Sequence, residues 1–225
     1  THLPDITLVS AVFSKSGNPV FFVANRAHHA DVGGMTPGSM PLSTSIFQEG
    51  VIIPALKLVE QGKIDKKIMG FLLNNVRTPV EREGDFAAQM MANITGVRRT
   101  EELVAKYGLE NTLFYAGALM DYAEELTRKT IQEIPDGIYT FEDLMDDDGI
   151  SDRDIKLQVK ITIYNDTATL DFSGCDPQVQ GSINAVYAIT LSAVLYVFRS
   201  LVSKDIPTNA GCMSCLLYTS DAADE

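Results

Sequence analysis

The 225-residue sequence is short of basic residues, with 18 Lys and Arg against 30 Asp and Glu and a formal net charge of −12. Surfaces that follow phosphates need clustered Lys and Arg, so this balance excludes a general binder of nucleic acids or of anionic membranes. Long apolar runs are also missing, because the longest, 185–198, is interrupted by Thr190 and Ser192. A membrane-spanning helix needs roughly 20 apolar residues, so no segment is predicted to cross a bilayer.

Cysteine is scarce. Cys175, Cys212 and Cys215 are too few and too late in the chain for a disulfide framework, and they lack the histidine partner of a zinc site. A reducing, cytoplasmic location is therefore expected. The sequence also contains neither G-x-x-x-x-G-K-[ST] nor G-x-G-x-x-G. Any nucleotide chemistry is expected to come from another polypeptide.

The segment 215–225, CLLYTSDAADE, follows a Gly-Cys-Met-Ser loop without any turn signal. It resembles the translation of a sequencing adapter, and we predict that it is a non-native tail. The alternative is a genuine frayed polar terminus, which would leave the functional predictions unchanged.

The elements that are present follow an α+β order. Strands are predicted over 6–13 and 20–25, helices over 80–94, 101–107 and 113–133, strands over 137–144, 155–164 and 168–172, and a helix over 183–202. Strands followed by helices and then strands exclude the strict alternation of a doubly wound fold. We predict antiparallel hairpins and a mixed sheet packed with a helical segment. The predicted parts are 1–78 (β-rich, with a Gly-rich loop), 79–135 (helical) and 136–214 (β-hairpin and helix).

Several finer features are predicted within these elements. Thr100 is predicted to cap the second helix, and Gly108 to end it. The segment 64–73 is compatible with a strand or a helix, and 183–202 is predicted to be an internal apolar helix. Two buried faces are predicted. They consist of Val80, Phe86 or Ala87, Met90 or Met91 and Ile94 in the first helix, and of Leu157, Val159, Ile161 and Ile163 in the strand 155–164.

The three histidines, His2, His28 and His29, all lie at the start of the chain. The turn 14–19 joins the first two strands, and if Phe13 pairs with Val20, the numbers of paired residues add up to 33. Asp5 then faces His28 across the ribbon, and His2 lies near Asp31 at its open end.

Imidazoles and carboxylates gathered in a small volume are the ligands that zinc, manganese or iron prefers. We therefore predict a divalent metal site formed by His2, Asp5, His28 and His29, with the choice between the two adjacent histidines left open. The plainer alternative is that these residues only hydrogen-bond the strand ends. A register slip of one residue would change which of them face inward.

Other polar residues allow two interpretations each. The first interpretation of the loop that starts at Asp31 and contains Gly33 and Gly34 is that its backbone amides bind an anion. The second is that it forms a tight structural turn. Arg77 is interpreted either as binding a substrate carboxylate through two hydrogen bonds or as pairing with a structural acidic residue. We place Asp31 and Arg77 among the catalytic candidates. Asp85 and Gln89 share one helix face and line a pocket or face solvent. The run 146–149 lacks the final glutamate of a calcium loop, which favours a solvated turn.

Several strings resemble the hydantoinase B family. They are THLPD at 1–5, AHHADVGGMTPGSMP at 27–41, FQEG at 47–50, NVRTPVEREGD at 75–85 and DIPTNAGC at 205–212. The family includes the B-type chain of N-methylhydantoinase, the corresponding half of 5-oxoprolinase and the α subunit of acetone carboxylase. Family chains are more than twice as long, so the resemblance implies an internal fragment of a larger multi-part chain, inactive alone.

The resemblance implies ATP-dependent chemistry at an amide or ketone carbonyl. A hydantoinase A-type partner binds ATP and activates the substrate, and the B-type chain contributes a metal site. In the acetone carboxylase branch a His-x-x-Asp and a later His hold manganese; His2 and Asp5 match the first element, and His28 matches the second better than His29. The first hypothesis is hydrolysis of a cyclic amide, and the alternatives are carboxylation of a ketone and a non-catalytic assembly role.

Overall fold

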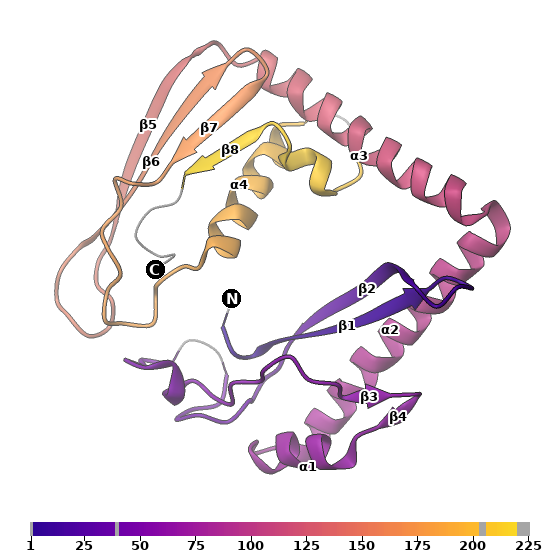
Figure 1. Ribbon diagram of the computed structural model, residues 1–225. Coiled ribbons are helices and arrows are strands. Elements are labelled where there is room, and N and C mark those ends of the chain that lie inside the picture. The colour runs from indigo at the N-terminus through magenta and orange to yellow at the C-terminus, as the bar shows by residue number, and fades with distance from the viewer. Residues whose placement is uncertain (1, 39–40, 203–205, 220–225) are drawn as a thin grey trace. The chain divides into compact units, whose positions relative to one another are not determined.

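The computed structural model describes residues 2–38, 41–202 and 206–219 and forms two compact units, His2–Gly108 and Leu109 onward (Figure 1). The first contains β1 (Asp5–Phe13), β2 (Pro19–His28), a 3-10 turn (Ile46–Gln48), β3 (Val59–Glu60), β4 (Lys63–Ile64), α1 (Lys66–Asn74) and α2 (Pro79–Tyr107). The second contains α3 (Leu109–Gln132), β5 (Gly137–Met145), β6 (Ile155–Tyr164), β7 (Thr167–Asp171), α4 (Tyr187–Leu201), a 3-10 turn (Ala210–Met213) and β8 (Leu216–Thr219). The predicted helical segment 79–135 is thus shared between the units.

The ribbon of β1 and β2 has the predicted register at its open end, where Asp5 pairs with His28. The pair from which that register was predicted is different, because a bulge between Val12 and Phe13 places Phe13 opposite Pro19. A bulge adds a residue to one strand only, so it changes the pairing beside the turn. From Val12 back to Asp5 the two residue numbers of each pair still add up to 33, so the alignment of the two strands there is as predicted.

One face of the ribbon packs on α2, and the other stays open to solvent. Ile6 and Leu8 of β1 join a core formed by Leu58, Met69, Leu72 and Phe86. Successive side chains of a strand point to opposite faces, so Thr7 and Val9 lie on the open face, where Val9 is 61% exposed. This alternation decides which face each residue at the ribbon end reaches.

Helix α2 is a single helix where two were predicted. The Thr100 hydroxyl donates to the carbonyl of Gly96 one turn earlier, so Thr100 lies inside the helix and caps nothing. Gly108, with φ +81°, ends the helix as predicted.

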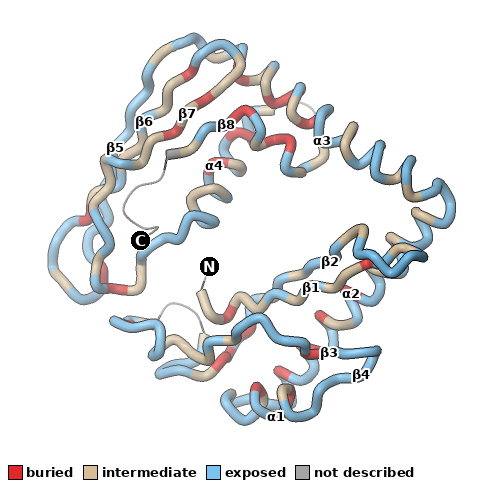
Figure 2. The backbone as a smooth tube through the Cα atoms, viewed as in Figure 1, coloured by how far each residue is buried: buried red, intermediate tan, exposed pale blue. Residues whose placement is uncertain are grey.

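The buried stripe of α2 matches the predicted one only in part: Phe86 is buried and Met90 packs against the same core, but the other predicted positions differ. Val80, Met91 and Ile94 are all more than half exposed, at 82%, 57% and 57%. Figure 2 shows this helix as mostly exposed, with isolated buried positions. The buried residues are Arg82, Phe86, Gln89 and Asn93. Three of these four are polar, so apolar periodicity alone could not identify the packed face.

Gly96 lets β2 approach α2 closely. A Cβ atom there would lie 2.5 Å from Cγ1 of Val23, whereas a Cβ atom at Gly84 of the same helix would meet nothing within 4 Å. We expect Gly96→Ala to lower the free energy of unfolding by about 1–2 kcal/mol, because the clash exceeds the gain in helix propensity. Gly84→Ala is the control and is expected to raise it by about 0.5–1 kcal/mol. Urea unfolding of both variants checks this, and equal gains would contradict the close packing.

The second unit is built on a four-stranded sheet in the order β5-β6-β7-β8. The first three strands are antiparallel, and β8 runs parallel to β7, so the sheet is mixed and the predicted α+β class is confirmed. Its core joins Ile131 of α3, Ile163, Leu170, and Val194 and Phe198 of α4. Strand β8 lies within the segment predicted to be a non-native tail, of which 220–225 fall outside the described residues.

Some elements of this unit differ from their predictions. Helix α3 begins at Leu109, four residues before the predicted start. Helix α4 was predicted to be internal, but Tyr196 is 74% exposed and only Val194 and Phe198 are buried. The predicted buried face of β6 also differs at one position, because Leu157 is 45% exposed. Within the described residues, none of the helices combines the length and hydropathy that a membrane span requires.

Asp148 is not part of a solvated turn. It is 3% exposed, and its carboxylate accepts hydrogen bonds from the amides of Ile150, Ser151 and Gly181. The hydrogen bond from the Ser151 amide is the largest of the effects that hold the pKa of Asp148 far below its usual range. The prediction for this segment was therefore wrong at Asp148, whose carboxylate ties the loop after β5 to the segment before α4.

Candidate metal centre

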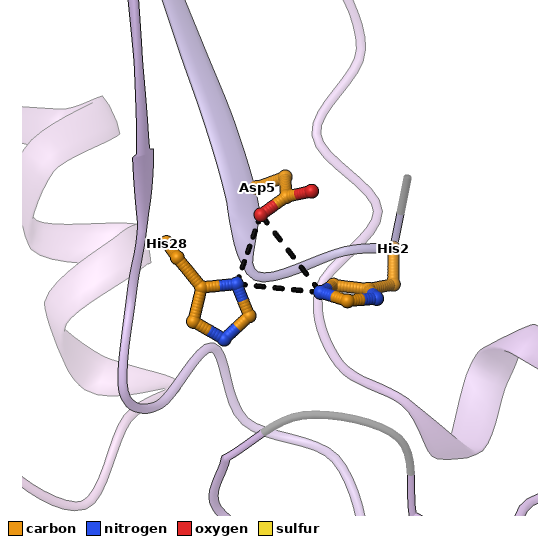
Figure 3. A group of neighbouring side chains, drawn as sticks. All are labelled: His2, Asp5 and His28. Atoms are coloured by element: carbon orange, nitrogen blue, oxygen red, sulfur yellow. Dashed lines mark hydrogen bonds and ion pairs between the residues drawn. The ribbon is translucent and has the colours of Figure 1, made fainter. Parts of the chain in front are cut away.

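The open end of the ribbon brings together His2, Asp5 and His28 (Figure 3). Nδ1 of His28 lies 2.9 Å from Oδ1 of Asp5 and 3.3 Å from Nε2 of His2. The third distance, from Nε2 of His2 to Oδ1 of Asp5, is 3.8 Å. Strand pairing positions Asp5 and His28, and a turn in which the Asp5 amide donates to the carbonyl of His2 positions the third residue.

These three side chains fit a divalent cation by chemistry and by spacing. Two ligand atoms at about 2.1 Å from one ion lie about 3.0–3.4 Å apart in octahedral or tetrahedral arrangements. The observed separations of 2.9, 3.3 and 3.8 Å bracket that range. Side-chain exposures of 31% for His2, 18% for Asp5 and 46% for His28 leave the group open to solvent on one side. An ion held here would keep positions for water or substrate.

The charge state of Asp5 suits a ligand. Burial is the largest single effect on its pKa and raises it, but the hydrogen bond from His28 and the electrostatic interactions with His2, His28 and Arg26 together outweigh burial. The net result is a pKa below the ordinary value, so Asp5 is a carboxylate at neutral pH.

The adjacent histidine, His29, points to the opposite face of the ribbon and is not in this group. It is 1% exposed, its Nε2 lies 2.9 Å from Oε1 of Gln89, and its ring centroid lies 4.7 Å from that of Phe86. Because the side chains of a strand alternate, two successive histidines at its end cannot both reach the open face. The geometry therefore favours His28 as the ligand.

Gln89 is a residue whose role was missed from the sequence. Its amide nitrogen donates to the carbonyl of Ile6 and to Oδ1 of Asn25, which leaves its oxygen to accept from Nε2 of His29. Asn25 in turn donates to Oδ1 of Asn93. The network fixes the back of the ribbon to α2, directly behind the strand end that carries His28. A signal was present in the i, i+4 spacing of Gln89 and Asn93 beside Phe86.

Neither of the two interpretations, a pocket wall or a solvated face, holds for both Asp85 and Gln89. Gln89 is 5% exposed, whereas the side chain of Asp85 is 47% exposed and lies 3.0 Å from Nη2 of Arg82. The two residues share a helix side but have different surroundings.

The structure brings the two catalytic candidates, Asp31 and Arg77, into contact with each other, and among the described residues neither belongs to the group formed by His2, Asp5 and His28. Nη1 of Arg77 donates to Oδ1 of Asp31 at 2.8 Å, its backbone amide donates to Oδ2, and its Nη2 donates to the carbonyl of Gly34. Burial of Asp31 is the largest effect and raises its pKa, but the amides of Arg77 and Gly33 and the guanidinium together bring the pKa below its usual value. The pair connects the Gly-rich loop to the segment before α2.

The glycines of this loop allow close backbone approach. Gly33 and Gly34 have φ values of +87° and +77°, and a Cβ atom would lie 2.7 Å from the Asn75 carbonyl oxygen in the first and 2.5 Å from the Gln48 carbonyl oxygen in the second. The Gly33 amide donates to Oδ1 of Asp31. These contacts favour the tight structural turn over an anion-binding loop.

The Asp31 contacts predict a pH-dependent stability. The pKa of Asp31 in the folded chain lies below the value of about 3.9 expected when unfolded. Its contribution is therefore complete above about pH 5 and is lost as the pH falls through the folded pKa. We expect Asp31→Asn to lower the free energy of unfolding by about 1–3 kcal/mol at pH 7. Urea titrations should show a smaller difference at pH 3, and a constant difference would contradict this account.

Comparisons with known proteins point to one family. The family model described as Hydantoinase B/oxoprolinase matches residues 1–221. A 5-oxoprolinase from Dictyostelium discoideum is 37% identical over 96% of this chain, and 5-oxoprolinase 1 from Arabidopsis thaliana is 38% identical over 95%. The putative B-type chain of a D-/L-hydantoinase from Pseudomonas sp. (strain NS671) is 30% identical over 94%. The chain spans 17%, 19% and 38% of the lengths of these relatives.

Two solved structures share the fold. An ATP-dependent caprolactamase from Pseudomonas jessenii superimposes with a TM-score of 0.89 and 27% identity, over 98% of this chain and 38% of the other. A nucleotide-free acetone carboxylase gives a TM-score of 0.85 over 96% of this chain and 30% of the other. At 20% identity the second likeness concerns the fold alone.

Proposed function

This chain belongs to the hydantoinase B/oxoprolinase family, and from that premise we propose that it supplies the metal-binding part of an enzyme that hydrolyses a cyclic amide with the help of ATP. The observation that carries the proposal is the convergence of His2, Asp5 and His28 at the open ribbon end. Relatives named as 5-oxoprolinases and as part of a hydantoinase, and a structural neighbour named ATP-dependent caprolactamase, support the reaction class.

In this proposal the three side chains hold zinc, manganese or iron. A bound ion would polarise an amide carbonyl or lower the pKa of a water molecule toward neutrality. Asp5 contributes the negative charge, and the two imidazoles bind as neutral ligands, so metal binding competes with protons on the histidines. The open face of the ribbon lets a small molecule reach the ligand group.

ATP is proposed to be used by a partner. The sequence contains neither of the two common nucleotide-binding loops, and the name of the Pseudomonas hydantoinase relative marks it as one of several subunits. An A-type subunit or domain would bind ATP and activate the carbonyl oxygen of the ring as a phosphate ester. The B-type chain would then present the metal site to the activated ring.

The first test is elemental analysis of the complete chain, co-expressed with its A-type partner, followed by an assay of lactam opening with and without ATP. About one zinc, manganese or iron per chain and ATP-dependent ring opening are the expected results. Incorporation of labelled bicarbonate into acetone would point instead to a ketone carboxylase. If the chain binds the A-type partner but contains no metal, the proposal is contradicted, and the non-catalytic assembly role is the remaining hypothesis.

A further inference from the structure

The open face of the β1–β2 ribbon continues beyond the ligand group in a regular ladder. Asp5 pairs with His28, the next pair on the same face is Thr7 with Arg26, and the one after that is Val9 with Ala24. Paired rows on one face are two residues apart, which is about 6.6–6.8 Å along a strand. Arg26 is thus the first cation along the face from the ligand group.

The guanidinium of Arg26 is held through one nitrogen, and its other nitrogens have no hydrogen-bond partner in the part of the chain that the structure describes. Its Nε donates to Oγ1 of Thr7 at 3.0 Å. Among the residues that the structure describes, no carboxylate lies within ion-pair distance of it, whereas Arg77 is paired with Asp31 and Arg128 with Glu124 and Asp166. A guanidinium fixed through Nε presents its two terminal nitrogens side by side, which is the fork that binds a carboxylate through both oxygens.

Arg26 is better placed than Arg77 for the carboxylate-binding role that the sequence suggested for Arg77. The guanidinium of Arg77 is bonded to Asp31 and Gly34, so it has little capacity left for a ligand. Arg26 lies in the row beside His28, on the face that the metal ligands share. A small ring whose carboxylate is attached next to its amide could place the amide carbonyl at the ligand group and the carboxylate at Arg26.

We propose that Arg26 binds the carboxylate of an acidic lactam, and that this contact makes the enzyme selective for carboxylated over neutral lactams. The inference rests on the proposed function, because it takes the ligand group as the place where the amide carbonyl binds. It names a specificity residue that does not hold the metal and the substrate group that this residue binds. Val9 and Ala24, the next row, offer apolar contact to one side of the ring.

The test compares two ligands that differ only in the carboxylate, 5-oxoproline and 2-pyrrolidone. Arg26→Gln is introduced into the complete chain with its A-type partner, and binding of both lactams is measured by calorimetry alongside metal content and turnover. We expect Arg26→Gln to weaken 5-oxoproline binding and raise its KM by about 10- to 100-fold, the loss typical of a charge-assisted pair. Binding of 2-pyrrolidone and metal content should stay the same. Arg26→Lys should recover part of the selectivity.

Arg98→Gln is the matched control, because Arg98 is an exposed arginine of α2 with a side chain 63% exposed. Unchanged selectivity in Arg26→Gln would overturn the inference. An equal loss for both lactams would overturn it too, since it would place the phosphate of the activated ring at Arg26. Loss of metal in Arg26→Gln would place Arg26 in the metal site and would also overturn the inference. If His28→Ala keeps its metal while Arg26→Gln loses selectivity, the metal proposal fails and the Arg26 assignment stands.

Discussion

His28→Ala is expected to abolish metal binding while leaving the fold intact. In the proposed site His28 would supply one of three ligand atoms, and its side chain is 46% exposed, so its removal would delete a ligand without opening a cavity. Outer-shell substitutions weaken metal sites by about 10- to 100-fold, and the loss of a direct ligand should exceed that. Metal content should fall from about one ion per chain to below about a tenth, and turnover should fall with it. Plasma mass spectrometry and thermal unfolding of the complete chain measure both.

Phe22→Ala is a suitable control for this experiment. Phe22 lies on the same open face of β2 and is 67% exposed, so this variant changes the ribbon surface and no ligand. It should keep its metal. Full occupancy in His28→Ala would remove this residue from the site, and equal losses in both variants would attribute the effect to the ribbon as a whole.

Gln89→Leu is expected to have the largest effect on stability. The change leaves Nε2 of His29, Oδ1 of Asn25 and the carbonyl of Ile6 without their present partner, and Gln89 is 5% exposed. Each buried polar group left unpaired costs about 1–3 kcal/mol. Some of the groups will find water, so the free energy of unfolding should fall by about 3–4 kcal/mol. Urea unfolding monitored by circular dichroism checks the value.

Met91→Ala provides the comparison on the same helix. Met91 is 57% exposed, and its replacement should change the free energy of unfolding by no more than about 0.5 kcal/mol. If Gln89→Leu is equally mild, the polar network contributes nothing measurable, and the ribbon is held by its apolar contacts alone. A large loss in both variants would mean that α2 is sensitive along its whole length.

Local signals were sufficient for part of the structure. The turn residues at 14–19 and the β-branched runs beside them predicted the ribbon, and its register placed Asp5 opposite His28. The same kind of reasoning failed in α2, where an expected break at Thr100 is absent. A threonine is common both at helix starts and inside helices, so its identity alone does not mark a boundary.

The buried face of α2 was the larger error. Apolar periodicity selected Val80 and Ile94, whereas the packed stripe contains Gln89 and Asn93. Polar side chains can be buried when each finds a partner, and here those partners come from β1 and β2. Hydrophobic pattern carries no information about such distant hydrogen bonds.

The sequence by itself determined the pairing of Asp5 with His28 and the family, because strand alternation, a short turn and recognisable strings act over neighbouring residues. Only the tertiary structure showed that His28 lies beside Asp5 while His29 is buried against α2, since the partner of His29, Gln89, lies 60 residues further along the chain. It likewise joined Arg77 to Asp31, which lies 46 residues earlier, and it left Arg26 as the cation in the row beside Asp5 and His28. These contacts depend on which polar groups come within hydrogen-bond distance when segments far apart in the sequence pack together. A local sequence pattern does not predict such contacts.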